Sequence, residues 1–264
     1  MDREKRLQRL RQLGFGTKGM IYVLLGALVT MAAFGLGGKV SDQKGVMLFL
    51  LDIPAGKIMV AIVALGLVAY TLWRFYLAYA DPRGEDVADV KRYGARVQYV
   101  YSGLFYGSIA FSFVKALFGK ASSGGEKEKV MLGKLLETNI GPWLIGAIAL
   151  GVAGQAIFQG YLAFTGKYMI QIDDQPDKAY KLVKYTGRIG YYARFALFGI
   201  LSYLLLIVIL DHNADAYDGT TGAFRHLLTY DYGRILMGVL ALGFLSYGLF
   251  CILVARYSNM TKLL

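Results

Sequence analysis

Arg188-Ile189-Gly190-Tyr191-Tyr192-Ala193-Arg194, followed by Phe198 one helical turn later, begins a long apolar run in this chain of 264 residues. The chain contains two earlier copies of the stretch, Gln12-Leu13-Gly14-Phe15-Gly16-Thr17-Lys18 followed by Tyr22 and Arg96-Val97-Gln98-Tyr99-Val100-Tyr101-Ser102 followed by Tyr106. An apolar run also follows each earlier copy. The stretch therefore marks the start of a membrane helix, and its repetition predicts a tandem array.

A second motif, in the returning helix, tests whether this repetition is a coincidence. Its three copies are Leu65-Gly66-Leu67-Val68-Ala69-Tyr70, Leu150-Gly151-Val152-Ala153-Gly154-Gln155 and Leu242-Gly243-Phe244-Leu245-Ser246-Tyr247. Their spacing agrees with that of the first motif to within one residue. We therefore expect a true triplication, with repeats at residues 11–80, 92–164 and 184–257.

The composition indicates a multi-pass membrane protein. Hydrophobic residues make up 56% of the chain and charged residues 18%, and the charges gather in short segments between the apolar runs. The connections are too short for an independent soluble core, so residues 1–264 should form one membrane domain. Six runs have the length that a bilayer core requires, at residues 17–36, 57–80, 97–118, 141–164, 190–210 and 233–255.

The positive charge of the chain points to lipid as its partner. The formal net charge is +11, but the Lys and Arg residues flank the apolar runs instead of forming one patch. Anionic lipid headgroups explain this pattern more simply than nucleic acid does. Lys and Arg are also more frequent on the side of the two termini, which predicts that both termini are cytoplasmic.

A short apolar segment lies between the two spans of each repeat, at residues 46–51, 130–136 and 223–228. These segments are too short to cross a bilayer, and we expect helices in the outer interface with Lys134, Arg225 and His226 facing water. Re-entrant half-helices are the alternative. Because each repeat has two spans, all repeats should share one orientation. The predicted fold is all-α, with three parallel two-helix repeats and pseudo-threefold symmetry about the membrane normal.

These repeats resemble a bacterial membrane family known as domain of unknown function 1206. The resemblance covers nearly the whole chain and rests on Gly14-Phe15-Gly16-Thr17-Lys18-Gly19, on Gly190-Tyr191-Tyr192-Ala193-Arg194 and on Trp73-Arg74 after the second motif. The middle repeat departs from the pattern, with Gln98 and Ser102 in place of the glycine and the cation. The resemblance implies three tandem two-helix repeats in the bacterial cytoplasmic (inner) membrane, and it implies no activity.

Three cations inside the predicted spans are the first candidates for function. Lys18 and Arg194 occupy equivalent positions one turn inside the cytoplasmic boundary, and Arg74 should lie at a similar depth. In the simplest interpretation their stems run along the helices and their charges reach the lipid headgroups. The alternatives are a pocket between helices for an anionic lipid headgroup and a substrate site.

Polar residues at one equivalent position form a second set of candidates, Tyr70, Gln155 and Tyr247. They are candidates to line the pseudo-threefold axis as a polar constriction, although packing is the simpler interpretation. Other polar groups of the spans, such as Gln159 and Ser202, are expected to form interhelical hydrogen bonds.

The sequence offers no constellation suited to catalysis, a metal or a cofactor. All carboxylates lie in loops or at helix ends, which argues against ion-coupled transport. His212 and His226 lie in the last outer loop, away from haem or zinc spacing, and Cys251 is the single cysteine. Residues 211–215 imitate the first half of a calcium loop, but Ala216 stands where that loop needs glycine. We expect no catalytic residues, no metal and no cofactor.

These features favour a non-catalytic membrane protein, acting as an accessory or scaffold subunit of a membrane complex and binding lipid. Its expected partners are anionic lipids on the cytoplasmic side and other membrane-protein subunits, and not nucleic acid. The alternative is a passive channel or facilitator for a small solute along the axis past Tyr70, Gln155 and Tyr247. A lipid-modifying enzyme is a third hypothesis, with less support because the interface lacks clustered carboxylates or histidines.

Overall fold

The computed structural model describes residues 2–36, 42–80, 89–119, 124–169 and 177–257, and its described part is helical. The described residues form six long α-helices, three short ones and two single-turn 3₁₀ helices, Lys167–Met169 and Ala214–Ala216. The α-helices are α1 (Asp2–Ala33), α2 (Gln43–Leu51), α3 (Gly56–Ala80), α4 (Asp89–Leu117), α5 (Gly124–Leu136), α6 (Gly141–Thr165), α7 (Asp177–Leu210), α8 (Gly219–Leu227) and α9 (Gly233–Tyr257).

The six long helices confirm the predicted number of spans. Each contains a stretch long and apolar enough to cross a membrane, at Gln8–Ala33, Gly56–Ala80, Arg92–Leu117, Gly141–Thr165, Ala179–Leu210 and Gly233–Tyr257. The predicted starts at residues 17, 97 and 190 were wrong as helix boundaries, because α1, α4 and α7 begin well before them. Charged residues with good helix propensity continue these helices beyond the apolar run, so the hydropathy boundary does not mark the end of the helix.

The short helices α2, α5 and α8 confirm that the outer segments are helical. Asp42 caps α2, where its Oδ1 accepts a hydrogen bond from the backbone N–H of Gly45 at 2.7 Å. Lys134 and Arg225 are exposed as expected. His226 is partly covered, because its ring contacts Tyr203 and Tyr230. Their place in the membrane interface stays a prediction.

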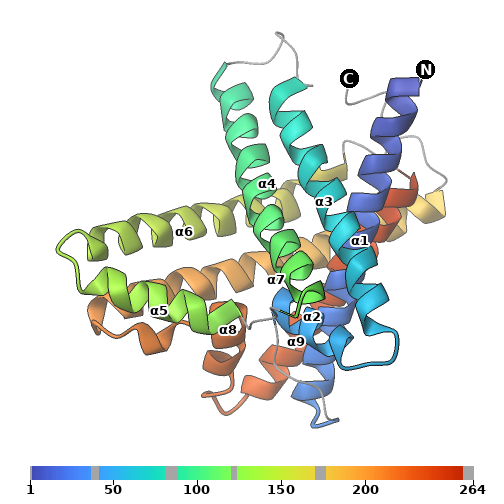
Figure 1. Cartoon of the computed structure of the whole chain (residues 1–264). Coiled ribbons are helices and arrows are strands. Elements are labelled where there is room, and N and C mark those ends of the chain that lie inside the picture. The colour runs from blue at the N-terminus through green and yellow to red at the C-terminus, as the bar shows by residue number, and fades with distance from the viewer. Residues whose placement is uncertain (1, 37–41, 81–88, 120–123, 170–176, 258–264) are drawn as a thin grey trace.

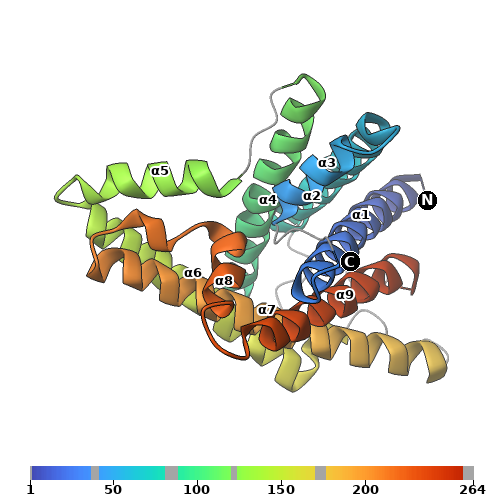
Figure 2. The ribbon, with the colours of Figure 1, turned by 90° about the horizontal axis from the view of Figure 1, so that it is seen from below.

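Neighbouring repeats are joined in cyclic order. The second helix of each repeat packs on the first helix of the next, which pairs α3 with α4, α6 with α7 and α9 with α1. Figure 1 shows the α6/α7 pair running across the α3/α4 pair, and Figure 2 separates the same two pairs when the molecule is seen from below. The cyclic pairing is compatible with three repeats around one centre, but the parallel, pseudo-threefold arrangement stays a prediction.

Contacts within the repeats are unequal. α1 packs on α3 in the first repeat and α7 packs on α9 in the third, whereas the described parts of α4 and α6 scarcely touch. A Cβ at Gly14 would lie 2.7 Å from the Cα of Tyr70, and one at Gly190 would lie 2.6 Å from the Cα of Tyr247. Only glycine permits so close an approach of two helices. The equivalent residue of the middle repeat is Gln98, whose side chain would not fit into so close a contact.

The core lies where α1, α3, α7 and α9 meet. α1 and α9 run antiparallel and approach backbone to backbone, since a Cβ at Gly26 would lie 2.8 Å from the carbonyl oxygen of Ala241. Leu25, Val29 and Phe244 are fully buried beside this contact. This tight joint holds the first and third repeats together, and both contribute cations to the site described next.

Candidate functional site

All six long helices contribute to one central pocket. Its volume is about 70 Å³, enough for a small chemical group or a few water molecules. It is lined by Lys18, Arg74, Gln98, Tyr101, Ser102, Phe105, Tyr106, Gln155, Phe158, Gln159, Leu162, Tyr191, Arg194, Phe198 and Tyr247. The central pocket therefore brings together the three candidate cations and two of the three candidate axis residues.

Lys18, from α1, points into the helix bundle. Its side chain is only 4% exposed, and its ammonium group donates hydrogen bonds to the hydroxyl of Tyr247 at 2.9 Å and to that of Tyr70 at 3.3 Å. The same Nζ lies 4.7 Å from the ring centroid of Tyr106. Neutral hydroxyls and aromatic faces thus surround this charge.

Arg194, from α7, occupies the equivalent position and is 7% exposed. Its Nη1 donates to the hydroxyl of Tyr22 at 2.7 Å, and its guanidinium carbon lies 4.6 Å from the ring centroid of Tyr247. The hydroxyls of Tyr22 and Tyr106 are 3.3 Å apart, which extends the network to α4. The burial of Lys18 and Arg194 contradicts the simplest interpretation of these cations, in which their charges reach the headgroups along the helix surface.

Arg74, from α3, completes the cationic side of the pocket. Its Nε donates to the hydroxyl of Tyr70 at 2.8 Å, and its guanidinium carbon lies 5.7 Å from the ring centroid of Tyr99. The hydroxyl of Tyr70 therefore accepts hydrogen bonds from both Arg74 and Lys18. One phenol oxygen between two cations cannot neutralise either charge.

The described residues that line the central pocket include no carboxylate. Three ion pairs between described residues lie outside the pocket and join Lys44 to Glu128, Lys129 to Asp215, and Arg225 to Asp218. Removing a cation from water costs several kcal/mol unless an opposite charge and good hydrogen bonds compensate. Lys18, Arg74 and Arg194 therefore place three positive charges around a pocket in which no described carboxylate balances them.

The middle repeat forms a neutral side of the pocket. Ser102 stands at the position of Lys18, and Gln159 at that of Arg74. The expected interhelical hydrogen bond is confirmed for Ser202, whose hydroxyl donates to the carbonyl oxygen of Ala149 at 3.0 Å. It is not found for Gln159, which is 3% exposed and whose Oε1 has no partner among the described residues. An unpaired buried acceptor costs about 1–3 kcal/mol, so a donor that reached this atom would be stabilising.

The central pocket opens sideways between α4 and α6. Tyr101 and Phe105 line it from α4 and remain 45% and 37% exposed, and Gln155 lines it from α6 and is partly exposed. Gly151 of α6 is exposed, and a Cβ there would meet no described atom within 4 Å. We call this region the α4–α6 opening. Both helices have the length and composition of membrane spans, so we expect this opening to face lipid.

The three candidate axis residues take two roles. Tyr70 and Tyr247 are 0% and 3% exposed and accept hydrogen bonds from Lys18, whereas Gln155 lies at the α4–α6 opening. A channel along the axis stays a prediction. Sequence reasoning missed Tyr22 and Tyr106 as hydrogen-bonding partners, although the repeat spacing already placed them at equivalent positions.

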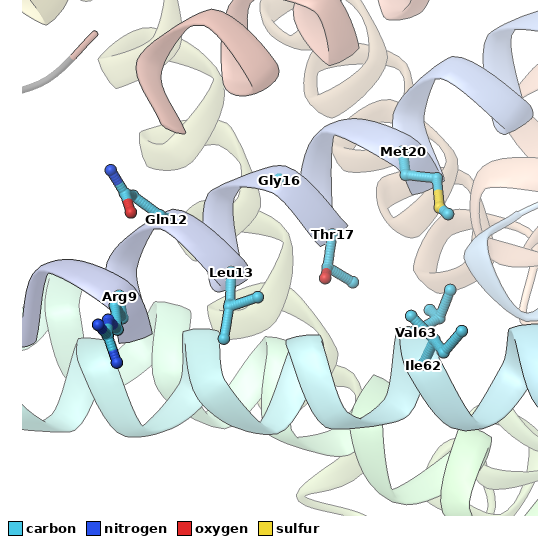
Figure 3. A pocket seen from close by; sticks show the side chains of 8 residues that line it. All are labelled: Arg9, Gln12, Leu13, Gly16, Thr17, Met20, Ile62 and Val63. Carbon is cyan, nitrogen blue, oxygen red and sulfur yellow. The ribbon is translucent and has the colours of Figure 1, made fainter. Parts of the chain in front are cut away.

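A second hollow, of about 510 Å³, lies between α1 and α3 (Figure 3). Met20 and Val63 line it, and they correspond to Leu104 and Ile148 beside the α4–α6 opening. In the first repeat Thr17 of α1 packs against Gly66 of α3. This contact separates the groove from the interior of the helix bundle. Its lining is Arg9, Gln12, Leu13, Gly16, Thr17, Met20, Ile62 and Val63, which includes none of the candidate residues.

No cluster of three or more potential metal ligands occurs in the part of the chain that the structure describes. In the segment that imitates a calcium loop, the carboxylate of Asp215 pairs with Lys129 at 2.6 Å. The absence of a metal and of a cofactor stays a prediction.

Comparison with known proteins confirms the triplication. The family described as Domain of Unknown Function (DUF1206) matches residues 13–81, 97–166 and 189–258, which correspond to the three repeats. A Bacillus subtilis (strain 168) protein described as "Uncharacterized protein YxxB" is 28% identical over 257 residues, which cover 97% of this chain and 92% of that protein. No solved structure matches the chain.

Proposed function

This chain belongs to the family described as Domain of Unknown Function (DUF1206), and we propose that it is a lipid-binding membrane protein whose central pocket holds the phosphate of an anionic headgroup. One observation carries the proposal. Lys18, Arg74 and Arg194 converge on a pocket whose described lining contains no carboxylate. A phosphate group would supply the opposite charge and accept hydrogen bonds that the tyrosine hydroxyls satisfy only in part.

The α4–α6 opening supports a lipid as the source of this anion. A headgroup can enter sideways there while its acyl chains remain outside, against the exposed apolar residues of α4 and α6. Leu104 and Ile157 are examples of such residues, at 63% and 68% exposure. Soluble ligands have no need of a lateral entrance of this kind.

The chemistry of the pocket supports a non-catalytic role. Its described side chains are cations, amides, hydroxyls, aromatic rings and one leucine, and none of them is a carboxylate or an imidazole that could act as a general base at neutral pH. We therefore propose an accessory or scaffold subunit of a membrane complex that uses bound lipid. The basic segments on the side of the termini support a place in the bacterial cytoplasmic membrane with both termini inside.

Lipid binding to the purified protein tests the proposal. Phosphatidylglycerol should bind and raise the melting temperature, whereas zwitterionic phosphatidylcholine should do so much less. Arg194→Met should weaken phosphatidylglycerol binding by about tenfold or more, because a hydrogen bond to a charged group contributes about 1.5–3 kcal/mol. Arg225→Met is the matched control, since Arg225 is exposed and pairs with Asp218 far from the central pocket.

Equal binding of the two lipids, or equal losses in the two variants, would refute the headgroup pocket. The passive channel is the second candidate and has less support, since Tyr70 and Tyr247 are buried and bonded to Lys18. Flux of small neutral solutes or ions through reconstituted vesicles, increased by Tyr247→Ala, would favour the channel instead.

A further inference from the structure

The two sides of the central pocket differ in charge, and from this difference we infer that its ligand is a polyol phosphate, a phosphate ester with hydroxyl groups beside the phosphate. This inference rests on the proposed function and names the class of headgroup. The cationic side comes from the first and third repeats and the neutral side comes from the second. A ligand that satisfies both sides needs an anionic part and a neutral hydrogen-bonding part.

The neutral side is rich in groups that both donate and accept. Gln98 and Ser102 contribute from α4, and Gln155 and Gln159 from α6. An amide offers one carbonyl oxygen and two N–H donors, and a serine hydroxyl donates and accepts. Hydroxyl groups of a ligand have the same double capacity, so they pair with such side chains without any charge.

Gln159 decides which kind of ligand fits. Its Oε1 is buried without a partner among the described residues, so a ligand that brings a donor to this atom would satisfy it. A phosphate diester that is ionised at neutral pH has no proton to donate. Lipid headgroups offer two common donors, an ammonium group and a hydroxyl group.

Electrostatics selects the hydroxyl over the ammonium. An ammonium group at Gln159 would sit in the same small pocket as Lys18, Arg74 and Arg194, which would repel it. A hydroxyl donates the same hydrogen bond without a charge. The pocket therefore fits a glycerol-type headgroup better than an ethanolamine, choline or serine headgroup.

The size and shape of the site agree with this assignment. A volume of about 70 Å³ suits the phosphate and the first hydroxyl-bearing carbon. The rest of the headgroup would lie toward the α4–α6 opening, where Gln98 and Gln155 are partly exposed. These two amides are then placed to contact a second hydroxyl.

A pair of lipids with the same charge isolates the hydroxyl contribution. Phosphatidylglycerol and phosphatidylmethanol are both anionic diesters, but only the first carries headgroup hydroxyls. Lipids of matched acyl chains would be titrated into the intact protein in nanodiscs and bound copies counted by native mass spectrometry. We expect phosphatidylglycerol to bind at least about tenfold more tightly than phosphatidylmethanol, because phosphatidylmethanol leaves the Oε1 of Gln159 unpaired.

The variant Gln159→Met assigns this preference to one side chain. It should lower phosphatidylglycerol affinity toward that of phosphatidylmethanol and leave phosphatidylmethanol affinity within about twofold, because methionine removes the acceptor at similar volume. An equal loss for both lipids would contradict the assignment to Gln159. Should the variant fail to fold, the comparison of the two lipids on the unmodified protein still decides whether hydroxyls are recognised.

The outcomes separate this inference from the proposed function. Equal affinities for the two anionic lipids, both above phosphatidylcholine, would overturn the polyol inference and leave the anionic headgroup intact. Affinities no higher than that of phosphatidylcholine would overturn both. Displacement of phosphatidylglycerol by soluble glycerol 3-phosphate would uphold polyol phosphate recognition while refuting a lipid as its source.

Discussion

The first and third repeats differ from the middle repeat in the way their two helices meet. Gly14 and Gly190 let α1 and α7 lie directly on Tyr70 and Tyr247, whereas Gln98 stands at that position in α4. One turn later, the small residues Thr17 and Ala193 contact the second helix, and Tyr101 replaces them in the middle repeat. The same two-helix unit therefore closes or opens according to the size of two side chains.

The middle repeat also differs in chemistry. The closed repeats supply Lys18, Arg74 and Arg194, while the open repeat supplies Ser102 and Gln159 at positions equivalent to them. Access to the central pocket and the positive charge that lines it therefore come from different repeats. Two repeats build the cationic side, and the third provides the entrance and the neutral side.

The glycines of the returning helices give the largest expected effect. Gly66→Ala and Gly243→Ala should each destabilise the protein by about 1–3 kcal/mol, because the new methyl group would overlap Thr17 or Ala193. Gly151→Ala, at the equivalent position, should be neutral or stabilising by up to about 1 kcal/mol, because it meets open space and gains helix propensity. Thermal unfolding in detergent measures all three. Equal destabilisation at Gly151 would mean that α6 is covered in the membrane.

Closing the middle repeat is the next test. Gln98→Gly combined with Tyr101→Ala should let α4 approach α6 as α1 approaches α3. Spin labels at Leu104 and Ile148 should then report a shorter distance, and phosphatidylglycerol affinity should fall by about tenfold, which corresponds to about 1.4 kcal/mol. Gly16→Leu is the control, since it fills the groove of Figure 3 at a position where a Cβ meets no described atom. Unchanged lipid binding in the closed variant would refute the lateral entrance.

The equivalent residues Tyr247 and Gln155 should respond differently to truncation. Tyr247→Phe removes the closest hydrogen-bond acceptor of Lys18 and should cost about 1 kcal/mol of stability. Gln155→Met should change stability by less than about 0.5 kcal/mol, because Gln155 is partly exposed at the α4–α6 opening. Chemical or thermal unfolding of both variants supplies the comparison, and a larger loss at Gln155 would contradict it.

The smallest effect is expected at the outer contact between the first two repeats. Burial raises the pKa of Glu128 in α5, Asp42 and Asp218 raise it further, and Lys44 at 3.8 Å opposes them. A raised carboxyl pKa means that the folded state holds the proton more tightly than the unfolded state does. Stability from this group is therefore present at low pH and is lost as the pH rises through the raised pKa.

Glu128→Gln should remove this part of the pH dependence and change stability at neutral pH by less than about 1 kcal/mol, since Glu128 is half exposed. Melting temperatures between pH 4 and pH 8 test it. A pH profile that keeps its slope in the variant would assign the dependence to another group.

The sequence was sufficient for the repeats and the number of candidate spans. Periodicity and repeat spacing carry that information, because they depend on residue type and position alone. The sequence was insufficient to predict whether long side chains such as Lys18 and Arg194 point into the bundle or toward the headgroups. Arg194 pairs with Tyr22, 172 residues away, and hydropathy gives no sign of such a contact. Snorkelling was therefore the wrong expectation for Lys18 and Arg194.

The α4–α6 opening shows a different limit. The departures at Gln98 and Ser102 were visible in the sequence, but their meaning required knowing that Gly14 packs on Tyr70. Tyr101 was not recognised at all, because an aromatic residue in a membrane span is unremarkable until its counterparts are seen in contact with glycine. If the packing of one repeat is known, residues that differ at equivalent positions of another repeat can be interpreted directly.

Joining the three copies in one polypeptide has a consequence for how such a pocket can evolve. In an oligomer of identical two-helix subunits, each substitution appears in every subunit, so a change from glycine to glutamine would open every junction at once. After duplication and fusion, each copy accumulates changes independently. One copy is then free to lose its glycine and its cation while the other two preserve theirs, and an asymmetric ligand gains an asymmetric site.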